Sequence, residues 1–121
     1  MPSSSMPPAD AIRLRHMLDA GREAMGFCAG RTREDFERNR QLLLAVVKDL
    51  EIIGEAATKV SAETVAASSR IPWTDIIGMR HRLIHGYFDV DVEIVWNTVQ
   101  VDLPPLVALL DDALSEAPRN S

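Results

Sequence analysis

The stretch LLLAVVKDLEIIGEAA, residues 42–57, decides the fold of this 121-residue chain. Its apolar residues have helical spacing but cover most of the helix circumference. A helix of this kind must be buried on more than one side, which requires other helices around it. We therefore expect residues 42–57 to form the core of a helical domain.

This central helix is predicted to begin near Thr32 and to continue to about Val60. Thr32 and Asp35 have the spacing of a capping box, with aspartate in place of the usual glutamate. Gly54 lies inside this helix and Gly78 inside a later one, where each glycine costs about 1 kcal/mol relative to alanine. A close crossing of two helices is the expected compensation.

The sequence on both sides supplies further helices. Asp10 is a candidate N-cap for a first helix that ends before Gly30, and Ser61 is a candidate cap for a short helix. Asp89 or Asp91 is expected to cap the last helix. The predicted ranges are 10–29, 61–65, 74 to 84 or 85, and 89 or 91 to beyond 110.

The last helix contains Pro104 and Pro105, which lack two backbone donors and should kink it or start a new helix. No alternation typical of strands appears. The fold class is therefore predicted as all-α, with four principal helices, an extra short helix and a kinked last helix. We expect one domain over residues 9–116, between a flexible lead of residues 1–8 and a tail of residues 117–121.

Composition restricts the setting of the protein. Hydrophobic residues at 46% and charged residues at 26% are close to globular averages, which disfavours disorder. A single cysteine, Cys28, excludes a disulfide within the chain and a zinc site built on several thiolates, and it favours a reducing, cytoplasmic setting. No apolar run approaches the roughly 18 residues of a membrane span, so we expect no membrane partner.

The formal net charge of −5 argues against a protein that binds nucleic acid through bulk electrostatics. Arg80, His81, Arg82 and His85 nevertheless form a basic island. Any contact with nucleic acid must therefore be local, and an oligomer could bring two such islands together.

The island lies in the segment GMRHRLIHGY, residues 78–87, which contains an Arg-x4-His-x-Tyr pattern at Arg80, His85 and Tyr87. Arginine offers a fork of donors that fits phosphate oxygens, and histidine moves protons near neutral pH. On an unbroken helix Arg80 and His85 would lie roughly 140° apart. A helix end at Ile84 or His85, followed by Gly86, would let them converge. Such a site could cleave RNA without a metal, with His85 moving protons and Arg80 stabilising the added charge on the phosphate.

Each of these residues also has a structural interpretation. Arg80 could pair with Glu51, Glu55 or Asp89, as an arginine near a helix end usually does. His85 could close the helix by bonding a carbonyl, and Tyr87 could lie at the rim of the core. Spacing alone leaves these alternatives open.

A zinc site is a further alternative. His81, His85 and Asp89 follow a His-x3-His-x3-Asp pattern. However, Gly86 should break the helical phase before Asp89, and the neighbouring arginines would repel a cation. We therefore expect no metal.

Several segments resemble the HepT-like (DUF86) branch of the HEPN superfamily. They are LEIIGEAA at 50–57, IPWTDIIGMRHRLIHGYF at 71–88, VDVEIVW at 90–96 and DLPP at 102–105. The likeness extends over roughly residues 10–115 and includes the signature at Arg80, His85 and Tyr87. It implies a HEPN-type four-helix up-and-down bundle.

The resemblance also implies a function. HepT-like proteins are homodimeric ribonuclease toxins of type VII toxin–antitoxin systems, in which Arg and His from both subunits line a cleft. By this likeness Arg80 and His85 are catalytic, and cleavage requires no cofactor. The expected antitoxin is an MntA-like minimal nucleotidyltransferase that uses ATP to attach AMP to Tyr87. The added phosphate charge beside Arg80 would keep RNA out of the site.

The second signature position is often Asn or Asp in relatives, whereas this chain has His81. His81, Glu51 and Glu55 are candidates for a supporting role. A second function class also fits, namely a catalytically silent subunit that binds a nucleotidyltransferase. The acidic net charge favours this class, whereas the intact Arg80, His85 and Tyr87 favour the nuclease.

Overall fold

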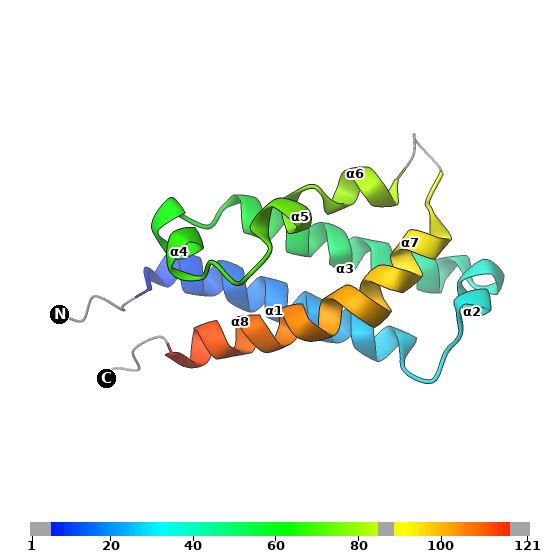
Figure 1. The fold of residues 1–121 in the computed structure, drawn as a ribbon. Helices are drawn as coiled ribbons and strands as arrows, with labels where there is room; N and C mark the ends of the chain where they lie inside the picture. Colours follow the sequence, from blue (N-terminus) through cyan, green and yellow to red (C-terminus); the bar gives the residue numbers. More distant parts are fainter. Residues whose placement is uncertain (1–5, 85–88, 117–121) are drawn as a thin grey trace.

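Helix α3, Arg40–Thr58, is the central element of the structure (Figure 1). The computed structural model describes residues 6–84 and 89–116. Helix α3 packs along α1 and also contacts α5 and α6. Its buried side chains include Leu43, Val46, Leu50 and Ile53. The predicted buried central helix is therefore confirmed, although Leu44 on its outer side is 44% exposed.

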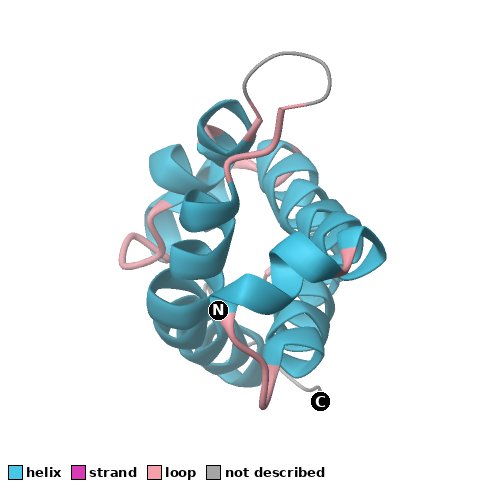
Figure 2. Cartoon of the chain, turned by 90° about the vertical axis from the view of Figure 1, so that its right-hand side faces the viewer, coloured by secondary structure: helices cyan, strands magenta, loops and turns pink. Residues whose placement is uncertain are grey.

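The described residues form an all-α bundle, which confirms the predicted fold class. Seen along the bundle, the helices surround a common interior filled by the core side chains (Figure 2). The other elements are α1 Pro8–Cys28, α2 Arg33–Arg38, α4 Ala62–Ala67, α5 Trp73–Ile77, α6 Met79–Leu83, α7 Val92–Asn97, the π-helical segment η1 Thr98–Asp102, and α8 Leu103–Glu116. Among the described residues, no helix combines the length and apolar character needed to cross a membrane.

The prediction of one helix from Thr32 to Val60 is wrong, because the chain bends at Asn39. Asn39 has φ −131° and ψ 92°, and its Oδ1 accepts a hydrogen bond from the backbone N–H of Leu42 at 3.0 Å. Asn39 is thus the N-cap of α3. The predicted capping interaction at the start of α2 does form, since the Thr32 N–H donates to Asp35 Oδ2 at 2.8 Å. The bend lets Phe36 pack edge to face on Trp96.

The predicted helix over residues 74–84 is also interrupted, at Gly78. Gly78 has φ −82° and ψ −2° and separates α5 from α6. The expected close crossing occurs at Gly54, where an added Cβ would lie 3.3 Å from the carbonyl oxygen of Ile76. Glycine therefore lets α5 and α6 lie close against α3, which places α6 beside the outer face of α3.

Asp10 is not the N-cap of the first helix. Pro7 occupies that position, and Asp10 lies one turn inside, 4% exposed. Its carboxylate accepts hydrogen bonds from the Ser61 N–H and from the hydroxyls of Ser61 and Thr64. Burial raises the pKa of Asp10, but these hydrogen bonds outweigh it, so the pKa lies below its usual value. Ser61 caps α4 as predicted, accepting from the Thr64 N–H at 3.4 Å.

The last predicted helix is irregular, as its prolines suggested. Asp91 caps α7 by accepting from the Ile94 N–H at 3.1 Å. The π-helical segment η1 then precedes Pro104 and Pro105, and the Leu103 N–H bonds the Thr98 carbonyl five residues back. The wider turn lies where two proline rings would otherwise clash with carbonyls of the preceding turn.

Candidate functional site

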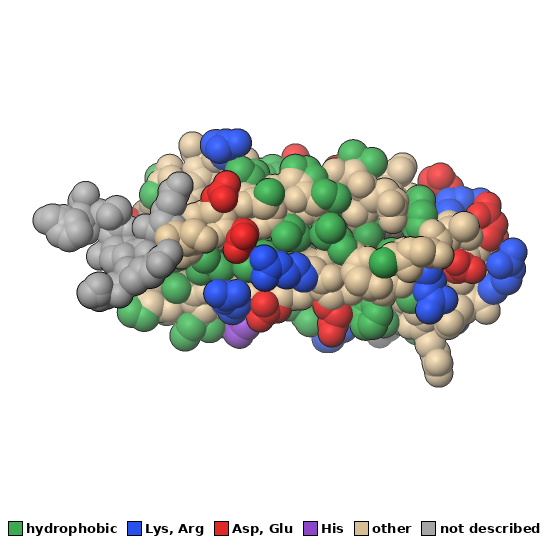
Figure 3. Space-filling model, turned by 90° about the horizontal axis from the view of Figure 1, so that it is seen from below, with side chains coloured by type: hydrophobic (Ala, Val, Ile, Leu, Met, Phe, Trp, Pro, Cys, Tyr) green, Lys and Arg blue, Asp and Glu red, His purple; other side chains and the backbone are tan. Residues whose placement is uncertain are grey.

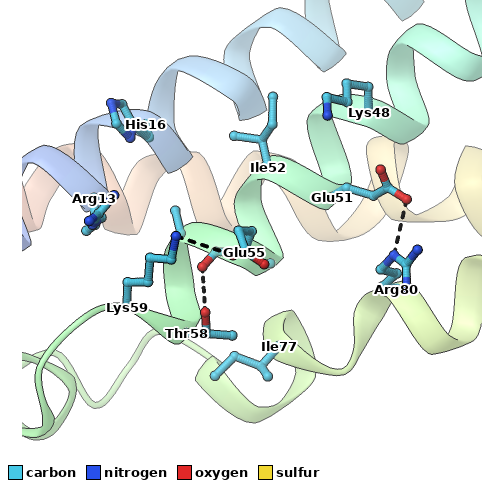
Figure 4. A pocket seen from close by; sticks show the side chains of 12 residues that line it. Arg13, His16, Lys48, Glu51, Ile52, Glu55, Thr58, Lys59, Ile77 and Arg80 are labelled. Carbon is cyan, nitrogen blue, oxygen red and sulfur yellow. Dashed lines mark hydrogen bonds and ion pairs between the residues drawn. The ribbon is translucent and has the colours of Figure 1, made fainter.

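Arg80 lies on α6 and faces α3. Its Nε donates to Glu51 Oε2 at 3.3 Å (Figure 4). The Arg80 side chain is 67% exposed, and no bond of its two terminal nitrogens occurs within the described part of the chain. The ion pair therefore orients the guanidinium and leaves its terminal donors available to a ligand.

Arg80 borders a groove of about 550 Å³. The floor of the groove is the outer face of α3, and its walls are α1 on one side and α5–α6 on the other (Figure 4). The lining residues are Arg13, His16, Lys48, Glu51, Ile52, Gly54, Glu55, Ala56, Thr58, Lys59, Ile77 and Arg80. Most of the side chains in this list are charged or polar, so the groove suits a charged ligand.

The candidate supporting residues occupy different places. Glu51 holds Arg80, whereas Glu55 lines the same groove but pairs with Lys59 at 3.3 Å. His81 is exposed, does not line this groove, and forms no hydrogen bond or ion pair with the described residues. Glu51, Glu55 and Asp89 were the possible acidic partners of Arg80. Among the described residues, Arg80 forms its ion pair with Glu51.

The other two signature residues, His85 and Tyr87, lie outside the described residues. Helix α6 ends at Leu83, and Ile84 is extended with φ −121° and ψ 119°. Ile84 then pairs with Val90 in an antiparallel bridge, and the Asp91 N–H donates to the Leu83 carbonyl at 2.8 Å. The helix end that the Arg80–His85 spacing requires is thus present, one residue earlier than expected.

The zinc alternative includes His85, which lies outside the described residues. Within residues 6–84 and 89–116, no group of three His, Cys, Asp or Glu side chains could hold a metal ion. Cys28 is 3% exposed, and burial raises the pKa of its thiol, although Arg31 acts in the opposite direction. It is a core residue.

Four basic groove residues were not recognised from the sequence: Arg13, His16, Lys48 and Lys59. A usable signal exists on α3, where polar side chains recur at 48, 51, 55 and 59, the spacing of one helix face. The contribution of α1 has no such local signal, because it depends on how α1 packs on α3.

Asp49 is an acidic residue of α3 that is buried in the core and does not line the groove. It is 2% exposed, and its Oδ2 has no hydrogen-bond partner in the described part of the chain. Burial, together with the hydrogen bond and negative charge of Glu23, raises the pKa of Asp49 to about 7.

Most of the chain, including the helices that form the groove, matches a known protein family. A family model described as Ribonuclease HepT-like covers residues 17–113, from α1 to α8. The chain belongs to the HepT-like family. The resemblance noted from the motifs is therefore confirmed, and Arg80 of this HepT-like chain lies inside the matched region.

Curated proteins agree with this assignment. "Putative RNase TTE0752" of Caldanaerobacter subterraneus subsp. tengcongensis is 36% identical over 103 residues, which are 85% of this HepT-like chain and 92% of that protein. "Probable ribonuclease HepT" of Thermococcus cleftensis is 42% identical over 73 residues, 60% of this chain and 66% of that protein. "Putative RNase MJ1216" of Methanocaldococcus jannaschii is 34% identical over 93 residues, 77% of each chain. No solved structure matches the chain significantly.

Proposed function

We propose that this HepT-like chain is a metal-independent RNA endonuclease whose catalytic residues are Arg80 and His85. Family membership and the ribonuclease names of its relatives support RNA cleavage. The observation that carries the proposal is the ion pair of Arg80 with Glu51, because it holds a largely exposed guanidinium beside a charged groove through Nε, and the terminal donors bond no described residue. That arrangement suits a phosphate.

In the proposed reaction the ribose 2′-oxygen attacks the adjacent phosphorus. The O2′–P bond forms, the P–O5′ bond breaks, and the products are a 2′,3′-cyclic phosphate and a free 5′-hydroxyl. His85 accepts the proton of the 2′-hydroxyl, and an imidazolium, from the same or the second subunit of a homodimer, protonates the leaving 5′-oxygen. Arg80 stabilises the additional negative charge on the phosphoryl oxygens.

The test is cleavage of RNA by the purified protein in EDTA. We expect activity in the unmodified protein, and a loss of at least about 100-fold in His85→Ala and in Arg80→Ala, as is typical when a general acid–base group is removed. His81→Ala is the matched control, since His81 is an exposed imidazole of the same segment. Undiminished cleavage by His85→Ala would remove this residue from the mechanism.

We further infer that the protein is the toxin of a type VII toxin–antitoxin pair. An MntA-like nucleotidyltransferase would transfer AMP from ATP to the Tyr87 hydroxyl, releasing pyrophosphate. The attached phosphate places negative charge close in sequence to Arg80 and so opposes RNA binding. Mass spectrometry after coexpression with such a transferase should show AMP on Tyr87. An unmodified Tyr87 in the presence of active transferase and ATP would refute this regulation.

A second candidate is a subunit that binds the transferase and does not cleave RNA. The net charge of −5 supports it. Absence of cleavage in EDTA and in Mg²⁺ with retained transferase binding would select this candidate.

A further inference from the structure

The groove beside Arg80 is built from residues of four helices, α1, α3, α5 and α6. Lys48, Glu51 and Glu55 of α3 and its C-cap Lys59 recur at helical spacing along the floor (Figure 4). Arg13 and His16 project from α1, and Ile77 and Arg80 from the opposite wall. Arg80 and Lys48 lie at one end of the groove, and Arg13 and Lys59 lie at the other (Figure 4).

The groove carries a surplus of positive charge in an acidic chain. Its two carboxylates are already engaged, Glu51 with Arg80 and Glu55 with Lys59. Arg13 and Lys48 form no ion pair or hydrogen bond within the described part of the chain, so the groove keeps two unneutralised cationic groups even when His16 is not counted.

The face of the molecule seen from below carries both signs of charge (Figure 3). On the face seen from below, cationic and acidic side chains are interspersed (Figure 3). Arg22 of α1, for example, pairs with Asp111 of α8 at 3.5 Å. Arg13 and Lys48 share one concave lining in which both carboxylates are already engaged, so this lining complements an anion.

The length of the groove indicates a polymer. Lys48 of α3 and Lys59, the C-cap of α3, are eleven residues apart, which corresponds to about 16 Å at about 1.5 Å per residue. A stacked nucleic-acid strand advances about 3.4 Å per nucleotide, so about five nucleotides fit this length. A second copy of this chain fits less well, because interface cores are depleted of charged residues.

We propose that this groove binds the phosphates of an RNA strand on one side of the scissile bond, through Arg13 and Lys48. The proposal rests on the proposed nuclease function, in which Arg80 holds the reacting phosphate. Arg13 and Lys48 position the strand and take no part in bond breaking. RNA of several nucleotides should therefore bind more tightly than a dinucleotide, whereas the chemical step is the same for both.

The experiment compares the unmodified protein with Arg13→Gln/Lys48→Gln and with a matched control, Arg31→Gln/Arg70→Gln. Arg31 and Arg70 are exposed and do not line the groove, and both double variants change the net charge equally. Binding of a fluorescent single-stranded eight-nucleotide RNA is measured in EDTA over a range of salt concentrations. Cleavage of this RNA and of a dinucleotide is measured in parallel, and circular dichroism verifies folding.

The groove variant should bind the eight-nucleotide RNA at least about tenfold more weakly. The slope of log affinity against log salt should fall by about 1.4, since each lost phosphate contact on a single strand contributes about 0.7. Its KM for the longer RNA should rise by a larger factor than its KM for the dinucleotide. The control should keep the slope.

Equal losses in both variants would overturn the proposal in favour of bulk electrostatics. Unchanged RNA binding would also overturn it, as would a groove variant that alters only self-association or transferase binding. If the unmodified protein does not cleave RNA but the groove variant shows the lowered salt slope, the phosphate site stands and the nuclease mechanism fails. If the unmodified protein cleaves RNA but the groove variant keeps the salt slope, the nuclease mechanism stands and the phosphate site fails.

Discussion

Arg80 of α6 and Glu51 of α3 form an ion pair, with 3.3 Å between Nε and Oε2, across the place where the two helices lie side by side. The residues are 29 positions apart in the sequence. Both side chains are partly exposed, so the pair contributes at most about 1 kcal/mol to folding. Its importance therefore lies in the direction that it gives to the guanidinium.

We expect Glu51→Ala to lower the rate of RNA cleavage several-fold while changing the melting temperature little. Without Glu51 the Arg80 side chain loses its fixed orientation, whereas an exposed ion pair adds little stability. Steady-state cleavage and thermal unfolding measure the two effects. Glu55→Ala is the control, because Glu55 lines the groove but pairs with Lys59. Faster cleavage in Glu51→Ala would mean that Glu51 competes with the phosphate for Arg80.

Gly54→Ala should destabilise the fold by about 1 kcal/mol. The added Cβ would lie 3.3 Å from the Ile76 carbonyl oxygen. This oxygen belongs to the backbone of a packed helix and can move away only slightly. This strain exceeds the gain in helix propensity. Gly26→Ala is the matched variant, since nothing lies within 4 Å of its added Cβ and it should gain up to about 1 kcal/mol. Chemical denaturation of the two proteins gives the comparison, and equal shifts would contradict the close crossing.

Asp49 should make the protein less stable as the pH rises from about 4 to about 7. Burial and Glu23 raise the pKa of Asp49 to about 7 in the folded state, above its unfolded value of 3.8. The folded state therefore holds more protons over this range, and its stability falls as the proton is lost. Asp49→Asn, measured by denaturation at several pH values, should flatten this dependence. A slope unchanged in the variant would assign it to other groups.

Asp10→Ala should cost about 3 kcal/mol at pH 7. It leaves the Ser61 N–H and the hydroxyls of Ser61 and Thr64 without their buried acceptor. Because hydrogen bonds lower the pKa of Asp10, its contribution is present above its unfolded pKa and is lost as the pH falls through the folded value. The difference in unfolding free energy between the two proteins should therefore shrink in acid. A difference that is constant with pH would indicate a packing effect alone.

Helical periodicity was sufficient to predict the central position of α3, because Leu43, Val46, Leu50 and Ile53 repeat at the spacing that buries them. The bend at Asn39 was not predicted, since the polar residues 37–41 include no glycine or proline and only the capping tendency of asparagine marks the break. The role of Asp10 depends on Ser61, 51 residues away, so no local rule could find it.

The candidate site, like the fold, was predicted from the sequence only in part. Residue chemistry and spacing identified Arg80 and its possible acidic partners, but three carboxylates were equally compatible with the sequence. The choice of Glu51 depends on how α6 lies against α3, which follows from the glycine at position 54 and the break at Gly78. Arg13 and Lys48 were missed for this reason too, because their nearness to Arg80 is a property of packing.

The π-helical segment η1 changes what the last helical stretch can contact. A π turn accommodates one more residue than an α turn, so the side chains after it are rotated by about 100° relative to a continuous α-helix. The part before it, α7, contacts α2, α3 and α6, whereas α8 packs mainly on α1. One nearly continuous helical stretch can therefore pack against α2, α3 and α6 with its first part and against α1 with its last part, since the side of the helix that is buried changes at η1.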